Sequence, residues 1–523
     1  MSGGPRISPR DLRALLDGDG EIALLDVREE GVHSRAHLFL ATSAPLSALE
    51  PRIGALVPGL ATRIVLVDED EKLADATAGV LRRMGYRDLS ILAGGVPGWK
   101  QAGYEIYSGV HVPSKAFGEH VEHHDGTPHI SATELKAKLD AGEDLIVLDS
   151  RPMSEYRVMN IPGASDCPGA ELVYRVHQAA PRPETLVVVN CAGRTRSIIG
   201  AQSLINAGIP NKVVALKNGT MGWHLSGLPL ERGQSRAAAP PTAEALHHAK
   251  QAAERVARRF SIRFISRKEL AKMKGDASRT TYVFDVRSPQ EYEAGHPAGA
   301  ISAPGGQLVQ ETDSYAAVRN ARIALVDDHG VRATMTASWL LQLGWRDVFV
   351  VSNGLEGSLE RGLPKGYPPP EVRLVSAAEL SGHKSAVVLD FATSLQYRKE
   401  HIPEAAFAIR SRLGKQADAL KGKQVVCTSP DGVLARYAAA DLAALEIDAV
   451  ALEGGTAAWR SAGLPLETGE TKMLEPPEDV YYKPYDSKAQ IESAMRDYLQ
   501  WEVALLEQIR RDPDCRYRDY PAG

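Results

Sequence analysis

The sequence predicts an α/β protein that repeats one fold four times. The chain has 523 residues, which is too long for a single hydrophobic core. Two short signatures recur along it at intervals of roughly 100 to 135 residues, a domain length rather than a solenoid repeat. Between the signatures of each copy, strand patterns alternate with helical patterns. This alternation is typical of a mainly parallel sheet flanked by helices.

The first signature is an apolar run followed by Asp, any residue and Arg, with a Tyr and a Pro/Gly/Ala turn further along in most copies. The fourth copy has decayed, because Ala392 stands where the other copies carry Arg. The aspartates of the four copies are Asp26, Asp149, Asp285 and Asp390.

The second signature closes each copy. It begins with Gly-Gly or Asn-Gly and ends with Trp in three of the copies, at residues 94–99, 218–223, 353–358 and 454–459. From the two signatures we expect domains at residues 1–108, 109–234, 235–369 and 370–468, followed by a helical tail at 469–523.

Two connecting segments and the tail carry further expectations. Residues 111–128 are polar and contain four histidines, but no Cys or clustered carboxylates complete a metal site, so we expect a solvated linker and no metal. Residues 242–260 follow a Pro-Pro break and predict a helix that docks one half of the molecule onto the other. Residues 487–511 carry an apolar stripe that includes Val503, and predict a helix covering a domain or dimer surface.

Charge and composition exclude several classes of partner. The net charge of -5 and the pI near 6.3 give no reason to expect nucleic acid. The polar amino-terminus and the lack of a long apolar run predict a cytoplasmic protein without a membrane partner. The four cysteines lack CxxC spacing, which predicts free thiols in a reducing compartment. The sequence predicts no cofactor and leaves open whether the chain forms a homodimer.

One position in each copy, directly after a central strand, decides where covalent chemistry can occur. Aligning the helices that follow places Asp68, Cys191, Asp327 and Ser429 at this position. Only the second copy has a thiol there, and the fourth also loses one backbone N–H to Pro430. Cys427 lies two residues earlier, inside a strand pattern, and predicts a buried core residue.

The loop of the second copy predicts an anion-binding site with a thiol at its head. A strand, a tight loop and a helix N-terminus bring unpaired N–H groups together at the positive end of the helix dipole. We expect these amides and two arginine side chains to bind a dianion and to lower the pKa of Cys191 from about 8.5 towards neutrality. The residues of the predicted binding loop are Ala192, Gly193, Arg194, Thr195, Arg196 and Ser197.

Taken together, the motifs resemble those of the tandem rhodaneses, or thiosulfate sulfurtransferases. The resemblance rests on residues 149–164, the loop 191–196 and the closure at 218–223, and it extends over nearly the whole chain except the linkers and the tail. It implies four rhodanese-like domains, each with a mainly parallel sheet of about five strands between helices. It also implies that the first, third and fourth domains are inactive and that the second is catalytic. Because inactive copies are often paired with an active one in this family, the resemblance further implies that the first and second domains form such a pair.

The resemblance further implies a ping-pong reaction through a cysteine persulfide. Cys191 takes a sulfur from thiosulfate, and cyanide or a thiol then removes it. Asp149 and Arg151 are expected to support the strand and loop through an ion pair rather than to take part in the chemistry. Two positions depart from the family pattern, since Asn160 replaces a usual His and Ala192 replaces a basic residue.

Three other functions stay open at this point. The donor could instead be 3-mercaptopyruvate, although two arginines favour a dianion over that monoanion. The chain could also be a non-turnover persulfide carrier or scaffold. A cysteine phosphatase of related fold is disfavoured, because it needs Arg six positions after Cys, where this chain has Ser197.

Overall fold

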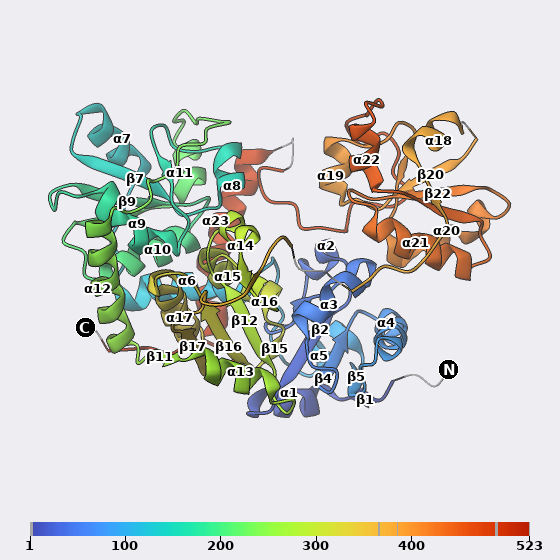
Figure 1. Cartoon of the computed structure of the whole chain (residues 1–523), viewed down its shortest axis with the longest axis horizontal. Coiled ribbons are helices and arrows are strands. Elements are labelled where there is room, and N and C mark those ends of the chain that lie inside the picture. Colours follow the sequence, from blue (N-terminus) through green and yellow to red (C-terminus); the bar gives the residue numbers. More distant parts are fainter. Residues whose placement is uncertain (1–3, 364–366, 384, 487–489, 522–523) are drawn as a thin grey trace.

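The computed structural model describes residues 4–363, 367–383, 385–486 and 490–521. Within these residues the chain forms four mainly parallel sheets flanked by helices, three of five strands and one of six, and a short two-stranded antiparallel pair (Figure 1). The five parallel strands of each sheet share one order: counted along the chain, the first lies at one edge, followed by the fifth, fourth, second and third. The predicted α/β fold with repeated domains is therefore confirmed.

The first domain extends its sheet with a strand from elsewhere. The short strand β15 (Val318–Arg319) of the third domain pairs antiparallel with β2, so the two domains share one sheet. The elements of the first domain are β1 (Arg6–Ile7), α1 (Pro9–Asp17), β2 (Ile22–Asp26), α2 (Glu30–His33), β3 (Thr42–Ser43), η1 (Leu46–Ala48), α3 (Glu50–Leu56), β4 (Arg63–Val67), α4 (Lys72–Arg83), β5 (Leu89–Leu92) and α5 (Gly95–Gln101).

The second domain contains the predicted nucleophile at the end of its central strand β9, which is β-branched and buried as an inner parallel strand should be. Its elements are α6 (Val112–Asp125), β6 (His129–Ile130), α7 (Ala132–Asp140), β7 (Leu145–Asp149), α8 (Met153–Val158), β8 (Ser165–Asp166), α9 (Glu171–Ala179), β9 (Leu186–Asn190), α10 (Thr195–Asn206), β10 (Val213–Leu216) and α11 (Gly219–Leu225).

The third domain begins with the predicted docking helix. This helix, α12, packs against α9 of the second domain and α17 of the third, which confirms its predicted role. The elements are α12 (Ala243–Arg259), β11 (Arg263–Ile265), α13 (Arg267–Gly275), β12 (Thr281–Asp285), α14 (Pro289–Ala294), β13 (His296–Pro297), β14 (Ile301–Ser302), α15 (Gly305–Gln310), α16 (Thr312–Tyr315), β16 (Arg322–Val326), α17 (Val331–Gln342), β17 (Asp347–Val351) and β18 (Leu359–Glu360).

The fourth domain forms a lobe of its own beside the first, seen in orange in Figure 1. Its elements are β19 (Leu374–Val375), α18 (Ala377–Gly382), β20 (Val387–Asp390), α19 (Ser394–Lys399), β21 (Ala406–Phe407), η2 (Arg410–Arg412), α20 (Leu413–Leu420), β22 (Val425–Thr428), α21 (Val433–Ala444), β23 (Ala449–Leu452) and α22 (Gly455–Ser461). The tail then returns to the second domain as α23 (Ile491–Ile509).

The pairing of domains differs from the prediction. The second domain packs mainly against the third, through α9 with α17 and α10 with α15, rather than against the first. A long amphipathic helix between two domains, α12, draws those two together by burying its alanine-rich face on both.

The predicted solvated linker at residues 111–128 is wrong. It forms α6, a helix of 14 residues that packs against α10 and α23. Although most of the segment is polar, one face of the helix is apolar and buried; it consists of Val112, Ala116, Phe117 and Val121. This helix therefore belongs to the surroundings of the predicted active-site loop.

The tail helix forms as predicted, over a shorter range. Its first expected residue, Ser487, lies outside the described residues. The buried face differs, because Glu502 and Leu505 are each 1% exposed whereas Val503 is 50% exposed. No described helix has both the length and the apolar composition that crossing a bilayer requires.

Candidate active site

Cys191 lies immediately after β9, at the carboxyl edge of its sheet. The equivalent position directly follows the corresponding strand in the other three domains, β4, β16 and β22, and holds Asp68, Asp327 and Ser429. Cys427 lies inside β22, fully buried, and burial raises the pKa of its thiol. Cys191 is thus the one cysteine that follows a strand at this position.

The aspartates of the first and third domains reveal what this loop does to an anion. The two carboxylate oxygens of Asp68 accept hydrogen bonds from the backbone N–H groups of Glu71, at 2.7 Å, and Ala74, at 2.9 Å. Asp327 is bound in the same way, by amides three and six residues further on, at 2.7 and 3.2 Å. The loop amides of this fold therefore converge on a negative charge at the position that Cys191 occupies.

The second domain places its thiol among the corresponding groups. The Cys191 Sγ lies 3.5 Å from the Ser197 Oγ, whose hydroxyl donates to the Arg194 carbonyl oxygen at 2.8 Å. The closing signature holds the loop from behind, since the Thr220 backbone N–H donates to the Cys191 carbonyl oxygen at 2.8 Å. Gly219 has a φ of +53°, and a Cβ there would lie 2.4 Å from that same oxygen, so only glycine fits.

Asp149 and Arg151 form the ion pair that the sequence predicted for them. The Arg151 Nε and Nη2 donate to the two Asp149 carboxylate oxygens at 2.8 and 2.6 Å, and both side chains are buried. Asp149 also accepts a hydrogen bond from the Nδ2 of Asn190, the residue before Cys191, at 2.8 Å. This geometry suits a supporting role for the pair.

The two arginines of the loop are not free to bind a dianion, contrary to the prediction. Arg194 donates to both carboxylate oxygens of Glu119, at 2.6 and 2.7 Å, and also to Glu122. Arg196 donates to Glu155, with its Nη2 2.8 Å from Oε2. Bidentate pairs of this kind already use the guanidinium donors, so the charge beside Cys191 is largely neutralised.

The Arg196 pair is also a feature of the fold rather than of the active domain alone. In the third domain, Arg332 binds Glu291 with the same separation of 41 residues along the chain, at 2.9 and 3.0 Å. That domain has an aspartate in place of the nucleophile. The arginine at this position therefore has a structural role that does not require a thiol.

The tail helix α23 covers the loop. Cys191 is 2% exposed, and Ala192 packs with Met495 and Leu499 in one apolar cluster. A Cβ added to Gly193 would lie 3.0 Å from the Glu502 Oε2. The thiol of Cys191 is therefore shielded from solvent in this structure, and α23 lies over the loop beside it.

Glu502 brings a buried carboxylate to this closed site. Its Oε1 accepts hydrogen bonds from Tyr498, at 3.0 Å, and from the Thr195 hydroxyl, at 3.3 Å. Its Oε2 is buried and has no hydrogen-bond partner among the described residues. Burial raises the pKa of Glu502.

The pKa of Cys191 is raised in this structure, so the predicted lowering is wrong for the closed site. Burial is the largest cause, and Glu502 adds to it. Arg196 and the hydroxyl and N–H of Ser197 act in the opposite direction. If α23 moved away from the loop, burial and Glu502 would raise the pKa less, while Arg196 and Ser197 would still stabilise the thiolate of Cys191.

Lys115 is a candidate site residue that the sequence reasoning missed. It lies on α6, is 5% exposed, and has no carboxylate within ion-pair distance among the described residues. Its Nζ lies 5.0 to 5.8 Å from the ring centroids of Trp501, Tyr498 and Tyr481. Burial lowers its pKa to about 8, against the influence of Glu502. Nothing in a polar helical segment singles out such a lysine before the tail is folded over it.

The strand order, the loop at the strand end and its single cysteine define a protein of the rhodanese type. The chain belongs to the rhodanese-like domain family, which it matches over residues 8–102, 131–226 and 266–360. These segments lie in the first three domains, and the fourth repeats their strand order.

Known proteins support this assignment. Over 99% of its length the chain is similar to the crystal structure of a thiosulfate sulfurtransferase from Pseudomonas aeruginosa, with 45% identity, a TM-score of 0.94 and coverage of 100% of that chain. It is 28% identical over 174 residues, 32% of this chain, to the putative sulfur carrier protein YrkF of Bacillus subtilis, of which 91% is covered. It is 33% identical over 110 residues, 21% of this chain, to an HTH-type transcriptional regulator of Mycobacterium tuberculosis, of which 47% is covered.

Proposed function

We propose that the protein is a thiosulfate sulfurtransferase in which Cys191 carries the transferred sulfur. The observation that carries the proposal is the position of Cys191, which replaces the carboxylates that the loop amides bind in the first and third domains. The similarity over the whole chain to a thiosulfate sulfurtransferase supports this donor.

The reaction needs two nucleophilic displacements. In the first, the Cys191 thiolate attacks the outer sulfur of thiosulfate and forms a new sulfur–sulfur bond. The sulfur–sulfur bond of thiosulfate breaks, and sulfite leaves with its electron pair. In the second, cyanide or a thiolate attacks the terminal sulfur of the persulfide. Thiocyanate or a new persulfide forms, and the Cys191 thiolate is regenerated as the leaving group. The charged sulfur of the persulfide would occupy the space in which the loop amides bind a carboxylate in the silent domains.

The two loop arginines no longer distinguish thiosulfate from 3-mercaptopyruvate, because Glu119, Glu122 and Glu155 neutralise them. Near this loop, Lys115 has no carboxylate partner among the described residues and would attract either anion. The choice of thiosulfate as donor therefore rests on the similarity to the thiosulfate sulfurtransferase from Pseudomonas aeruginosa. Activity with 3-mercaptopyruvate should be measured in parallel. A phosphatase is disfavoured, since Ser197 rather than Arg follows six residues after the nucleophile.

The test is intact-mass analysis after incubation with thiosulfate, with thiocyanate formation measured in parallel. We expect the mass to increase by one sulfur atom, on the peptide that contains Cys191. The C191S variant should take up no sulfur and form no thiocyanate, while the matched C427S variant should behave as the unmodified chain. Sulfur uptake by C191S would contradict the single nucleophile.

A persulfide carrier for a partner protein is the second candidate function. The cover over Cys191 favours it, because a buried persulfide is protected from unwanted thiols. The similarity to a putative sulfur carrier protein points the same way. Sulfur uptake without turnover by cyanide or small thiols would favour the carrier over the enzyme.

A further inference from the structure

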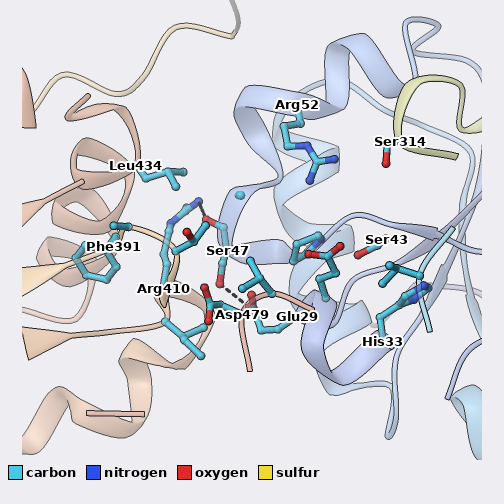
Figure 2. A pocket seen from close by; sticks show the side chains of 18 of the residues that line it. Glu29, His33, Ser43, Ser47, Arg52, Ser314, Phe391, Arg410, Leu434 and Asp479 are labelled. Atoms are coloured by element: carbon cyan, nitrogen blue, oxygen red, sulfur yellow. Dashed lines mark hydrogen bonds between the residues drawn. The ribbon is translucent and has the colours of Figure 1, made fainter. Parts of the chain in front are cut away.

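A cavity of about 320 Å³ lies where the first, third and fourth domains and the tail meet (Figure 2). Cys191 and its loop are not among the residues that line it. Five carboxylates line the cavity: Glu29, Glu30, Glu311, Asp313 and Asp479. The cavity is therefore a polar site of negative character, separate from the candidate active site.

Glu29 and Asp479 form its most acidic part. Glu29 is 4% exposed, and its Oε1 accepts hydrogen bonds from the hydroxyls of Ser47, at 2.5 Å, and Ser411, at 2.7 Å. Its Oε2 receives no hydrogen bond from any residue in the described part of the chain, and the side chain lines the cavity. Asp479 accepts the Ser394 N–H on one oxygen, at 2.7 Å, while its buried Oδ1 has no described partner.

These two carboxylates lie near enough for the charge of Asp479 to act on Glu29. Arg412 also acts on Glu29, but its guanidinium pairs with Glu475 and Glu478. Burial raises the pKa of both, and the charge of Asp479 raises that of Glu29 further. Buried carboxylates are costly unless a cation or hydrogen-bond donors compensate them. A positively charged group in the cavity would pair with the open Oε2 of Glu29 and would lie in the field of the nearby Asp479.

The cations that line the cavity are mostly bound elsewhere. Arg410 donates to both oxygens of Glu50, at 2.7 Å each, and His111 pairs with Asp313 at 2.9 Å. Arg52 differs, because it forms no hydrogen bond or ion pair with a described side chain. In Figure 2 it lies with Ser314 at the opposite end of the cavity from Glu29 and Asp479. The cavity therefore has an acidic end and one available guanidinium.

We propose that this cavity binds a small organic ammonium ion, with the ammonium group between Glu29 and Asp479. Arg52 would favour those ligands that also carry a carboxylate, as an amino acid does. Because Glu29 belongs to the first domain and Asp479 to the segment after the fourth, the ligand would also link those two parts of the chain. The proposal does not depend on the reaction at Cys191.

The test is calorimetric titration of the full chain with three probes of similar length: 1,4-diaminobutane, L-ornithine and succinate. We expect both ammonium probes to bind with dissociation constants of about 1 mM or tighter, and succinate not to bind. E29Q and D479N should each weaken both ammonium probes about tenfold or more, because the amide cannot pair with an ammonium ion. R52M should weaken L-ornithine selectively.

The control is E254Q, which removes an exposed carboxylate from α12, away from the cavity. It should bind all probes as the unmodified chain does, and no variant should melt at a lower temperature than the unmodified chain without ligand. If 1,4-diaminobutane binds and L-ornithine does not, the Arg52 part of the proposal is wrong and the ammonium site stands. Absence of binding by both ammonium probes, equal binding of succinate, or unchanged binding in E29Q would overturn the site.

Discussion

The Asp390 carboxylate accepts a hydrogen bond from the backbone N–H of Ala392 at 2.8 Å, at the point where the other domains also supply an arginine side chain. In the third domain, the equivalent Arg287 binds Asp285 through Nε and Nη2 at 2.9 and 2.6 Å. The turn has thus kept its shape in the fourth domain and lost its charge partner. Asp390 is 1% exposed, and its Oδ2 is buried without a described partner.

We predict that D390N stabilises the fourth domain above neutral pH. Burial raises the pKa of Asp390 to about 7 in the folded chain, against about 3.9 when unfolded. Between these values the folded state holds a proton that the unfolded state has lost, so stability falls as the pH rises from about 4 to about 7. The variant should lack this fall and gain about 2 to 4 kcal/mol at pH 8.

Hydrogen exchange of peptides from β20 and β22, followed between pH 4 and pH 8, measures this local stability. The matched control is D285N in the third domain, where the arginine is present and left without its partner, so that exchange from β12 should become faster. An unchanged pH dependence in D390N would show that Asp390 is not the titrating group.

The sequence was sufficient for the fold and for the position of Cys191 directly after a central strand, because both depend on local patterns. Apolar strands, turn residues and the loop after the strand are read over a few neighbouring positions, and Cys191, Cys427 and α12 lie where these patterns put them. The neutralised state of Arg194 could not be read in this way. Its partner Glu119 is 75 residues away, on a helix whose polar composition resembles a linker.

The closure of the site by the tail was beyond sequence reasoning for the same reason. A helical stripe indicates that one face is buried, but not against what. The face that α23 buries includes Glu502, a charged residue that a hydrophobic pattern leaves out, and it excludes Val503. The enclosed Lys115 appears only once α6 and α23 are packed together.

We predict that R332M destabilises the chain more than R196M. Arg332 is fully buried and pairs with Glu171 of the second domain as well as with Glu291. Its removal leaves Glu291 without a described cation and Glu171 with Arg175 alone, where two domains meet. Loss of one partner of a buried pair costs about 3 to 5 kcal/mol. Glu155, the partner of Arg196, keeps Lys483 at 3.7 Å. Thermal melting should show the larger decrease for R332M, and equal decreases would contradict this difference.

We predict that Lys115 attracts anions to Cys191. The ratio of alkylation rates with iodoacetate and iodoacetamide isolates this effect, because both reagents must pass the same cover and only the first is charged. K115M should lower the ratio about three- to tenfold. In the unmodified chain the ratio should fall as the pH rises through about 8, where Lys115 loses its proton. K250M, which removes an exposed lysine, should leave the ratio unchanged.

We predict that E502Q lowers the pKa of Cys191. The carboxylate of Glu502 raises the pKa of the thiol, whereas glutamine can still accept the hydrogen bonds of Tyr498 and Thr195 and so keep α23 in place. The rate of alkylation by iodoacetamide, measured against pH, should shift its midpoint downward and rise several-fold at pH 7, since one pKa unit is about a tenfold change in thiolate.

The plateau of the alkylation rate at high pH distinguishes an electrostatic effect of Glu502 on the Cys191 thiol from a change in how easily the reagent reaches it. A purely electrostatic effect moves the midpoint and leaves the plateau rate unchanged, while an opened cover raises the plateau itself. E507Q, on the exposed side of the same helix, should alter neither quantity. A raised plateau with an unchanged midpoint in E502Q would mean that α23 acts on Cys191 only as a physical barrier, and that its buried carboxylate does not tune the thiol.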